Sequence, residues 1–262
     1  MKILLPLPVL ATLTLLGTLT GVVSAAESVD ELPTPPDDKS LTLKWHDEFD
    51  GDQLDATKWE ARPDGKRKGG WWSPRAISLN GEGHLAITTF SDNGKPTTGC
   101  VWTKGKFEHS FGYYVARVKF QNQPGHWSAF WINGNGIGTV GDDGRDGTEI
   151  DIMEKPWLDD RVQHTLHWDG YGDHHKSKGN VVKVPDVMNG WHTFGLLWLP
   201  EEYIFYVDGK ETWRTNAGGV CQVPQYMLLS DEVGSWGGDI SEAKLPDQFL
   251  VDYVRVYDLV EK

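Results

Sequence analysis

Short alternating segments between turn residues are the feature that most limits how this chain can fold. In residues 113–120, apolar side chains stand at every second position from Tyr114 to Phe120, with Arg117 and Lys119 between them. That alternation is typical of a half-buried strand. The other strand-like runs are HLAITTF (84–90), HWSAFWING (126–134), VQHTLHW (162–168), WHTFGLLWL (191–199) and FLVDYVRVY (249–257). Gly, Pro, Asn and Asp separate these runs and no long segment keeps a helical period, so the pattern predicts an all-β sandwich or barrel.

One turn can be assigned directly. Asp208 and Gly209 stand between the strand-like runs YIFYV and KETWR. An Asp-Gly pair in that position is the strongest short-range signal of a β-hairpin. The sequence contains no internal repeat and no sign of a second domain.

The beginning of the chain differs from the rest. Residues 1–25 have one Lys, an apolar run and small residues at VSA, as in a secretory signal peptide. An uncleaved membrane anchor is the alternative, but Pro6 and Pro8 favour the signal peptide. Residues 26–40 are acidic and rich in Pro, which predicts a flexible leader. Residues 41–262 suit one all-β domain, and we expect a secreted or periplasmic protein with no membrane span after cleavage.

Composition narrows the class of partner. The formal net charge is −13, which argues against nucleic acid because a phosphate backbone needs a basic surface. Thirteen Trp residues are present, and Trp stacks well on the apolar faces of bulky ligands such as sugars. The two cysteines, Cys100 and Cys221, could form a disulfide or remain free thiols. We expect a monomer.

The segment GTEIDIMEKPW places three acids in a strand-like context. Side chains alternate along a strand, so Glu149 and Asp151 face away from the core that Ile150 and Ile152 enter. Strict alternation would bury Glu154, and a lone buried carboxylate is costly. One extra residue near Ile152, a β-bulge, would return Glu154 to the acidic face. The pattern therefore predicts a bulge.

Acids in this arrangement suit the hydrolysis of a glycosidic bond. That reaction needs one ionised carboxylate and one protonated carboxylic acid beside the scissile bond. The Cα atoms of Glu149 and Glu154 should lie roughly 12–13 Å apart at about 3.3 Å per residue, a gap that two long side chains narrow on a curved sheet. Asp151 between them could tune the nucleophile.

Other chemistries fit the sequence less well. DDGRDGTE resembles an EF-hand loop, but Gly144 and Met153 occupy positions where calcium ligands are needed. His164 and His167 lack the spacing of a helical zinc motif. No serine has the context of a serine nucleophile.

EIDIME resembles the active-site signature of glycoside hydrolase family 16, in its longer E-x-D-x-x-E form. The resemblance covers nearly all of residues 41–262. The other resembling segments are WHDEFDGDQLDATKWE (45–60), TKGKFEHSFGYYVARVKF (103–120), GHWSAFWING (125–134), WHTFGLLWLPEEYIFYVDGK (191–210) and VDYVRVY (251–257). It implies a jelly-roll sandwich of two curved antiparallel sheets with the substrate along the concave face. It also implies that Glu149 is the nucleophile, Glu154 the general acid/base and Asp151 the assisting carboxylate.

The resemblance implies further site residues. Trp127 and Trp131 match an aromatic strand that lines the cleft, although we do not expect both to face it. His167 matches a histidine that faces the site. Asp252 matches a ligand of a structural calcium on the convex face. The catalytic chemistry itself needs no cofactor.

The substrate is less sharply indicated. Related sequences often have W-P-A where this chain has Trp127-Ser128-Ala129, so the polymer is in question. The net negative charge favours a neutral β-1,3- or mixed-linkage glucan that an endo-acting retaining enzyme would cleave. A marine galactan such as agar, porphyran or carrageenan is the alternative, because the cations of GKRKGGWW (65–72) would bind sulfate if they lined the cleft. A non-catalytic lectin is a third possibility, but a binding protein does not need three crowded acids.

Overall fold

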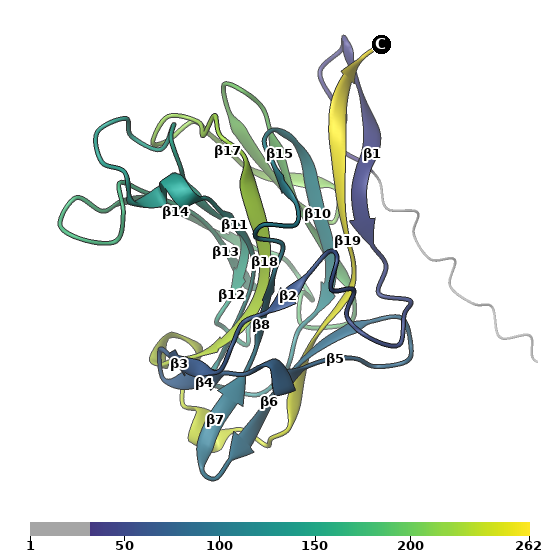
Figure 1. Cartoon of the computed structure of the whole chain (residues 1–262), viewed down its shortest axis with the longest axis vertical. Coiled ribbons are helices and arrows are strands. Elements are labelled where there is room, and N and C mark those ends of the chain that lie inside the picture. The colour runs from purple at the N-terminus through teal and green to yellow at the C-terminus, as the bar shows by residue number, and fades with distance from the viewer. Residues whose placement is uncertain (1–31) are drawn as a thin grey trace, which may run out of the picture.

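The computed structural model describes residues 32–262 (Figure 1). The predicted signal peptide, residues 1–25, and the first part of the predicted leader, residues 26–31, lie outside the described residues. Strand β1 spans Lys39–Asp47, so regular structure begins within the stretch predicted as leader. From residue 32 onward, no helix has the length and apolar character needed to cross a bilayer.

Two sheets form the domain, and every pair of named strands except β4–β7 is antiparallel. The back sheet contains, in spatial order, β17 (Lys210–Thr215), β16 (Tyr203–Val207), β15 (His192–Trp198), β10 (Gly112–Lys119), β19 (Asp247–Glu261), β6 (Leu85–Asp92), β7 (Lys95–Thr98), β4 (Gly70–Trp72) and β3 (Gly65–Arg67), with β1 beside β19 and β5 (Ile77–Leu79) beside β6. The front sheet contains β14 (Lys176–Lys183), β13 (Arg161–Trp168), β12 (Glu149–Lys155), β11 (His126–Asn133), β18 (Gln225–Val233), β8 (Cys100–Trp102) and β2 (Glu60–Ala61), with β9 (Glu108–His109) beside β18. The 3-10 helices of the described chain are η1 (Pro74–Ala76), η2 (Asn135–Gly138), η3 (Ser235–Gly237) and η4 (Ile240–Glu242). The predicted all-β jelly-roll sandwich is confirmed.

The core lies between the two sheets. Phe130 and Ile150 reach it from the front sheet, and Tyr114, Phe194 and Val256 reach it from the back sheet; all five are fully buried. The outer face of the front sheet borders an open side of the molecule, with β14 at one end and β3–β4 at the other (Figure 1). Functional side chains on that outer face are therefore held by a rigid, close-packed layer.

The hairpin predicted at Asp208 and Gly209 is confirmed. These two residues join β16 to β17, and their φ angles are 48° and 70°. Positive φ at both central positions is the geometry of a type I′ turn, whose twist matches that of the flanking strands.

Both cysteines are free thiols. Cys100 lies in β8 and Cys221 in the segment before β18, and both are buried and unpaired. The sequence left open a disulfide or two free thiols, and the structure has two free thiols. Burial raises the pKa of Cys100 far above its ordinary value and raises that of Cys221 to about 11, so neither sulfur ionises near neutral pH.

A buried carboxylate ties the two sheets together. Asp231 in β18 accepts hydrogen bonds from Thr89 in β6 at 2.6 Å and from Thr98 in β7 at 3.1 Å. It also contacts His126 Nδ1 at 2.9 Å and accepts from the backbone N–H of Trp127 at 3.2 Å. Burial alone would lower the pKa of His126, but its hydrogen bond to Asp231 raises it. This pairing therefore stabilises the fold fully below about pH 6.5 and is lost as pH rises through the higher folded pKa.

We expect Asp231→Asn to lower the free energy of unfolding by about 3 kcal/mol, because it leaves partners of a buried ion pair unmatched. Chemical denaturation at about pH 6 measures the loss. Asp208→Asn is the matched control, since Asp208 pairs with His192 at 2.8 Å in a much more exposed setting and should cost less than about 1 kcal/mol. Equal losses in the two variants would contradict this role of Asp231.

Candidate active site

A β-bulge in β12 sets the direction of the acids. Met153 pairs with Phe130 of β11, but Asp151 pairs with the very next residue, Trp131, so Ile152 is the extra residue. The pairing of β12 with β13 shifts at the same place. Ile152 and Met153 are both fully buried in the core, and the acids on either side of them lie on the opposite face. The bulge predicted from the sequence is confirmed.

The acids line a cavity of about 550 Å³ on the outer face of the front sheet. Six side chains predicted for the site contribute to its wall, namely Glu149, Asp151, Glu154, Trp127, Trp131 and His167. The remaining lining residues are Arg67, Lys68, Ala129, Tyr171, His175, Ser230 and Glu232. The front sheet therefore brings the predicted catalytic and binding residues to one place.

Glu154 is held in a buried, hydrogen-bonded position. Its side chain accepts from Trp127 Nε1 at 3.1 Å and from the Thr165 hydroxyl at 2.7 Å, and the residue is only 4% exposed. Burial raises the pKa of Glu154 well above its ordinary value, and the negative charge of Asp151 raises it further. The environment thus favours the protonated form that a general acid requires.

Glu149 has a different environment. It is half-buried, and its Oε2 atom accepts hydrogen bonds from Asn133 Nδ2 at 2.8 Å and from the Tyr171 hydroxyl. These two donors hold the carboxylate of Glu149 in one position. Glu154 is buried and Glu149 is half-buried, so the two glutamates differ in environment, as the two carboxyl groups of a glycosidase site do.

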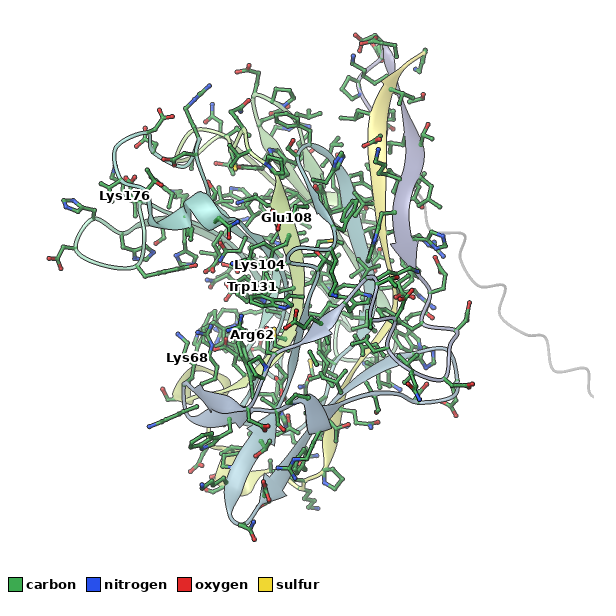
Figure 2. The ribbon with its side chains drawn as sticks, viewed as in Figure 1. Arg62, Lys68, Lys104, Glu108, Trp131 and Lys176 are labelled. Carbon is green, nitrogen blue, oxygen red and sulfur yellow. The ribbon has the colours of Figure 1, made fainter. Side chains whose placement is uncertain are left out.

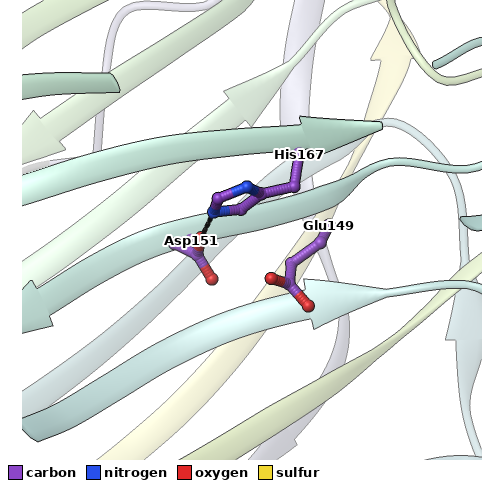
Figure 3. A group of neighbouring side chains, drawn as sticks. All are labelled: Glu149, Asp151 and His167. Carbon is purple, nitrogen blue, oxygen red and sulfur yellow. Dashed lines mark ion pairs between the residues drawn. The ribbon is translucent and has the colours of Figure 1, made fainter. Parts of the chain in front are cut away.

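Asp151 and His167 form a contact beside Glu149 (Figure 3). His167 Nε2 lies 3.4 Å from Asp151 Oδ2, and its other ring nitrogen lies 2.8 Å from Nε2 of His175. Burial raises the pKa of Asp151 well above its ordinary value, with the charge of Glu149 as the next cause. One atom from each of Glu149, Asp151 and His167 falls within 4.8 Å of the others, so these three groups could also ligate a cation.

Both tryptophans face the cavity, which corrects the expectation that only one would. Trp127 and Trp131 are four positions apart, and positions separated by an even number share one face of a strand. Trp127 donates to Glu154, while the Trp131 indole N–H donates to Ser230 Oγ at 3.0 Å. Trp236 packs against Trp127 with ring centroids 4.7 Å apart, which limits the rotation of the indole that contacts the acid.

Sequence reasoning missed the part of the cavity formed by the loop between β13 and β14. Tyr171 and His175 come from the insert DGYGDHHKSKG, which has no recognisable motif. The sequence did contain one signal for this part of the cavity. A Tyr and neighbouring histidines occur in a Gly-rich insert directly after the strand that carries His167. Their contacts with the acids depend on where the loop folds, which strand periodicity does not specify.

We expect Tyr171→Phe to lower kcat roughly tenfold, because it removes one of two donors to Glu149 at a charged hydrogen bond. The thermal midpoint should change little, since Tyr171 is 59% exposed. Initial rates at saturating polymer, together with a melting curve, measure both effects. An unchanged kcat would show that this hydroxyl does not position Glu149.

Asp252 does not have the surroundings of a calcium ligand. Its Oδ2 accepts a hydrogen bond from Arg117 Nη1 at 2.6 Å, and its Oδ1 lies 3.7 Å from His84 Nε2. Calcium takes six to eight oxygen ligands, whereas here both carboxylate oxygens face nitrogen groups. The calcium site stays a prediction, and the geometry at Asp252 does not fit it.

Comparison with known proteins agrees with this architecture. The family model for glycosyl hydrolases family 16 matches residues 66–255. An endo-1,3-1,4-beta-glycanase, ExsH, from Rhizobium meliloti is 31% identical over 166 residues, covering 62% of this chain and 34% of that protein. A keratan-sulfate endo-1,4-beta-galactosidase from Sphingobacterium multivorum is 29% identical over 237 residues, covering 83% of this chain and 55% of that protein. The match thus spans about a third to a half of the length of these relatives.

A solved structure gives the same result at the level of the fold. The endo-beta-1,3-glucanase from Pyrococcus furiosus superposes with a TM-score of 0.69 at 29% identity, covering 86% of this chain and 97% of that one. The family model covers most of the chain, including the bulged strand and its three acids. This chain belongs to glycosyl hydrolases family 16.

Proposed function

We propose that this protein is an endo-acting, retaining hydrolase of a β-linked glucan, with β-1,3- or mixed-linkage glucan as its substrate. One observation carries the proposal: the bulge at Ile152 puts a half-buried Glu149 and a buried Glu154 on one wall of the cavity. The relatives named as glucanases support the choice of polymer. An open cavity on a sheet face suits internal cleavage of a long chain.

The proposed reaction has two displacements. In the first, a Glu149 carboxylate oxygen bonds to the anomeric carbon while Glu154 donates its proton to the leaving oxygen. In the second, ionised Glu154 removes a proton from water, the water oxygen bonds to the anomeric carbon, and Glu149 leaves. Two inversions retain the anomeric configuration. Asp151 lies between Glu149 and Glu154 along the strand and interacts electrostatically with both carboxyl groups. We therefore assign it the role of tuning Glu149.

A panel of purified polymers tests the proposal. Laminarin, lichenan, xyloglucan, agarose, porphyran and carrageenan are scored for new reducing ends and for product length, and proton NMR follows the first product. We expect fast cleavage of laminarin or lichenan to mixed oligosaccharides with retained configuration. A first product of inverted configuration would contradict the double displacement.

A galactan hydrolase is the second candidate. Arg67 and Lys68, from the predicted cationic segment, line the cavity, and one relative acts on keratan sulfate. Arg67 is already paired with Glu232, its Nε donating at 2.7 Å, so Lys68 is the cation more available to a sulfate there. Cleavage of porphyran or carrageenan, with none of laminarin or lichenan, would select this candidate.

We also propose that the protein is exported, secreted or periplasmic, and acts as a monomer. The signal-like residues 1–25 support export. Mass spectrometry of the mature N-terminus and light scattering of the purified protein test the two statements. An intact N-terminus on a cell-retained protein would contradict export.

A further inference from the structure

We propose that the part of the front sheet formed by β2, β8 and β18 binds an anionic group carried by the polysaccharide, a sulfate ester or a carboxylate, through Arg62 and Lys104. This site lies outside the catalytic cavity, whose wall includes neither residue. The inference rests on the proposed function in one respect, because it assumes that the polymer lies across the outer face of the front sheet. It goes beyond that function in another, because the polymer bound here carries sulfate or carboxylate substituents that a neutral β-glucan lacks.

The pairing register connects this region to the acids. Asp151 pairs with Trp131, Trp131 with Leu228, and Leu228 with Trp102, so these residues form one row across β12, β11, β18 and β8. Three strand spacings of ~4.8 Å place Trp102 about 14 Å from β12. A polymer that crosses the strands from the acids over Trp131 would reach Trp102 next.

Two cations lie on the aromatic side chains at this end of the row. The Arg62 guanidinium carbon is 3.9 Å from the centroid of the Trp102 ring, and Lys104 Nζ is 5.4 Å from Trp102 and 5.2 Å from Tyr226. Figure 2 shows Arg62, Lys104 and Trp131 on the open side of the front sheet. A ring already covered by a guanidinium is a poor platform for stacking a neutral sugar, which points to recognition by charge.

These cations lack the carboxylate partners that are common elsewhere in this acidic protein. The arginines that form ion pairs with acids are Arg67, Arg75, Arg117, Arg161, Arg214 and Arg255. Within residues 32–262, neither Arg62 nor Lys104 forms such a pair. Glu60 and Glu108 are the acids closest in register, and the Glu108 carboxylate accepts a hydrogen bond from the backbone N–H of Gly105 at 3.0 Å.

Two buried donors in the same contact have no acceptor. Arg62 Nε and Trp102 Nε1 are buried, and no atom of the described chain accepts a hydrogen bond from either. Both groups can only donate, and buried donors in proteins are almost always paired. The planar guanidinium fork of Arg62 matches the paired oxygens of a sulfate or carboxylate, which points to an anionic ligand.

Arg62 is also held in place before any ligand arrives. Its backbone N–H donates to the carbonyl of Cys100 at 2.8 Å, directly after β2 ends. The stacking on Trp102 fixes the side chain as well. A cation that is ordered in advance loses little conformational entropy on binding.

Binding to matched polymers tests the site. The protein carries Glu149→Gln so that the polymer is not consumed, and the probes are laminarin, sulfated laminarin, carboxymethylated laminarin, porphyran and desulfated porphyran. We expect at least one anionic polymer to bind roughly tenfold more tightly than its neutral counterpart, a preference that falls with added salt. Arg62→Gln should abolish most of that preference and leave the neutral affinity unchanged, and Lys104→Met should reduce it.

Two further variants sharpen the result. Arg62→Lys keeps the charge but not the fork, so it should restore only part of the preference. Lys95→Met removes a cation that lies 4.9 Å from Trp71 in the back sheet and should change nothing. The sulfated and carboxymethylated arms show which oxyanion is bound. Equal affinity for anionic and neutral polymers, or an unchanged preference in Arg62→Gln, would overturn the inference.

Hydrolysis assays on the protein with Glu149 intact separate this result from the proposed function. Cleavage of laminarin without any Arg62-dependent preference would overturn the anionic site and leave the β-glucan activity standing. An Arg62-dependent preference in a protein that cleaves none of the polymers would support the site and contradict the activity.

Discussion

Glu149→Gln should reduce hydrolysis by roughly 10⁴- to 10⁶-fold, the loss seen when other hydrolases lose a nucleophile or its activating partner. The amide cannot form the glycosyl–enzyme bond, while its shape preserves the contacts with Asn133 and Tyr171. Single-turnover rates on the preferred polymer measure the effect. Glu82→Gln, a change at an exposed residue between β5 and β6, is the control and should keep full activity.

The smaller variant Glu149→Ala gives a sharper test of the nucleophile. Azide added to this variant should form a bond to the anomeric carbon from the side that the carboxylate no longer occupies, while Glu154 protonates the leaving oxygen. One displacement inverts the configuration, so the glycosyl azide should have the opposite anomeric form to the substrate. Turnover by Glu149→Ala alone at the normal rate would exclude Glu149 as the nucleophile.

Glu154→Gln should lower turnover of the polymer by about 10²- to 10⁴-fold, the range attributed to general acid–base catalysis. An aryl glycoside with a nitrophenolate leaving group needs little protonation, so its first step should stay fast and the glycosyl–enzyme should accumulate. A burst of nitrophenolate followed by a slow phase measures this. Equal losses for polymer and aryl glycoside would argue against Glu154 as the acid.

The same substitution should change the dependence of stability on pH. Because burial raises the pKa of Glu154, the folded protein holds this proton more tightly than the unfolded chain does. The stabilisation is complete below about pH 4.5 and is lost as pH rises through the folded pKa. Glu154→Gln should therefore melt at an increasingly higher temperature than the original protein as pH is raised. A constant difference in melting temperature would contradict the raised pKa.

Much of the fold followed from periodicity and turn chemistry. Tyr114 and Val118 point into the core as their alternation predicts, although Tyr113 and Val115 are buried too, in a second cluster on the other face of β10. Alternation identifies the core face, but it cannot tell whether the opposite face is covered by neighbouring side chains. The bulge at Ile152 was predictable because strict alternation would point Glu154 into the core. One extra residue shifts the alternation and returns Glu154 to the outer face.

The rest of the site depends on contacts between distant segments. Tyr171 reaches Glu149 from a loop, and Arg62 reaches Trp102 from a neighbouring strand end; neither approach leaves a periodic trace in the sequence. The same holds for Asp252, whose partner Arg117 lies 135 positions away. Local patterns determine which face a side chain occupies, whereas charge partners depend on sheet order.

The two buried, unpaired cysteines can be used to measure how often the folded protein opens. A thiol-modifying reagent attacks the thiolate, and neither Cys100 nor Cys221 is exposed or ionised in the folded state. Alkylation should therefore proceed only as fast as the sandwich opens, with Cys100 monitoring the front sheet. The protein also requires no oxidant to mature, so a reducing cytosol should yield the same fold as an oxidising compartment.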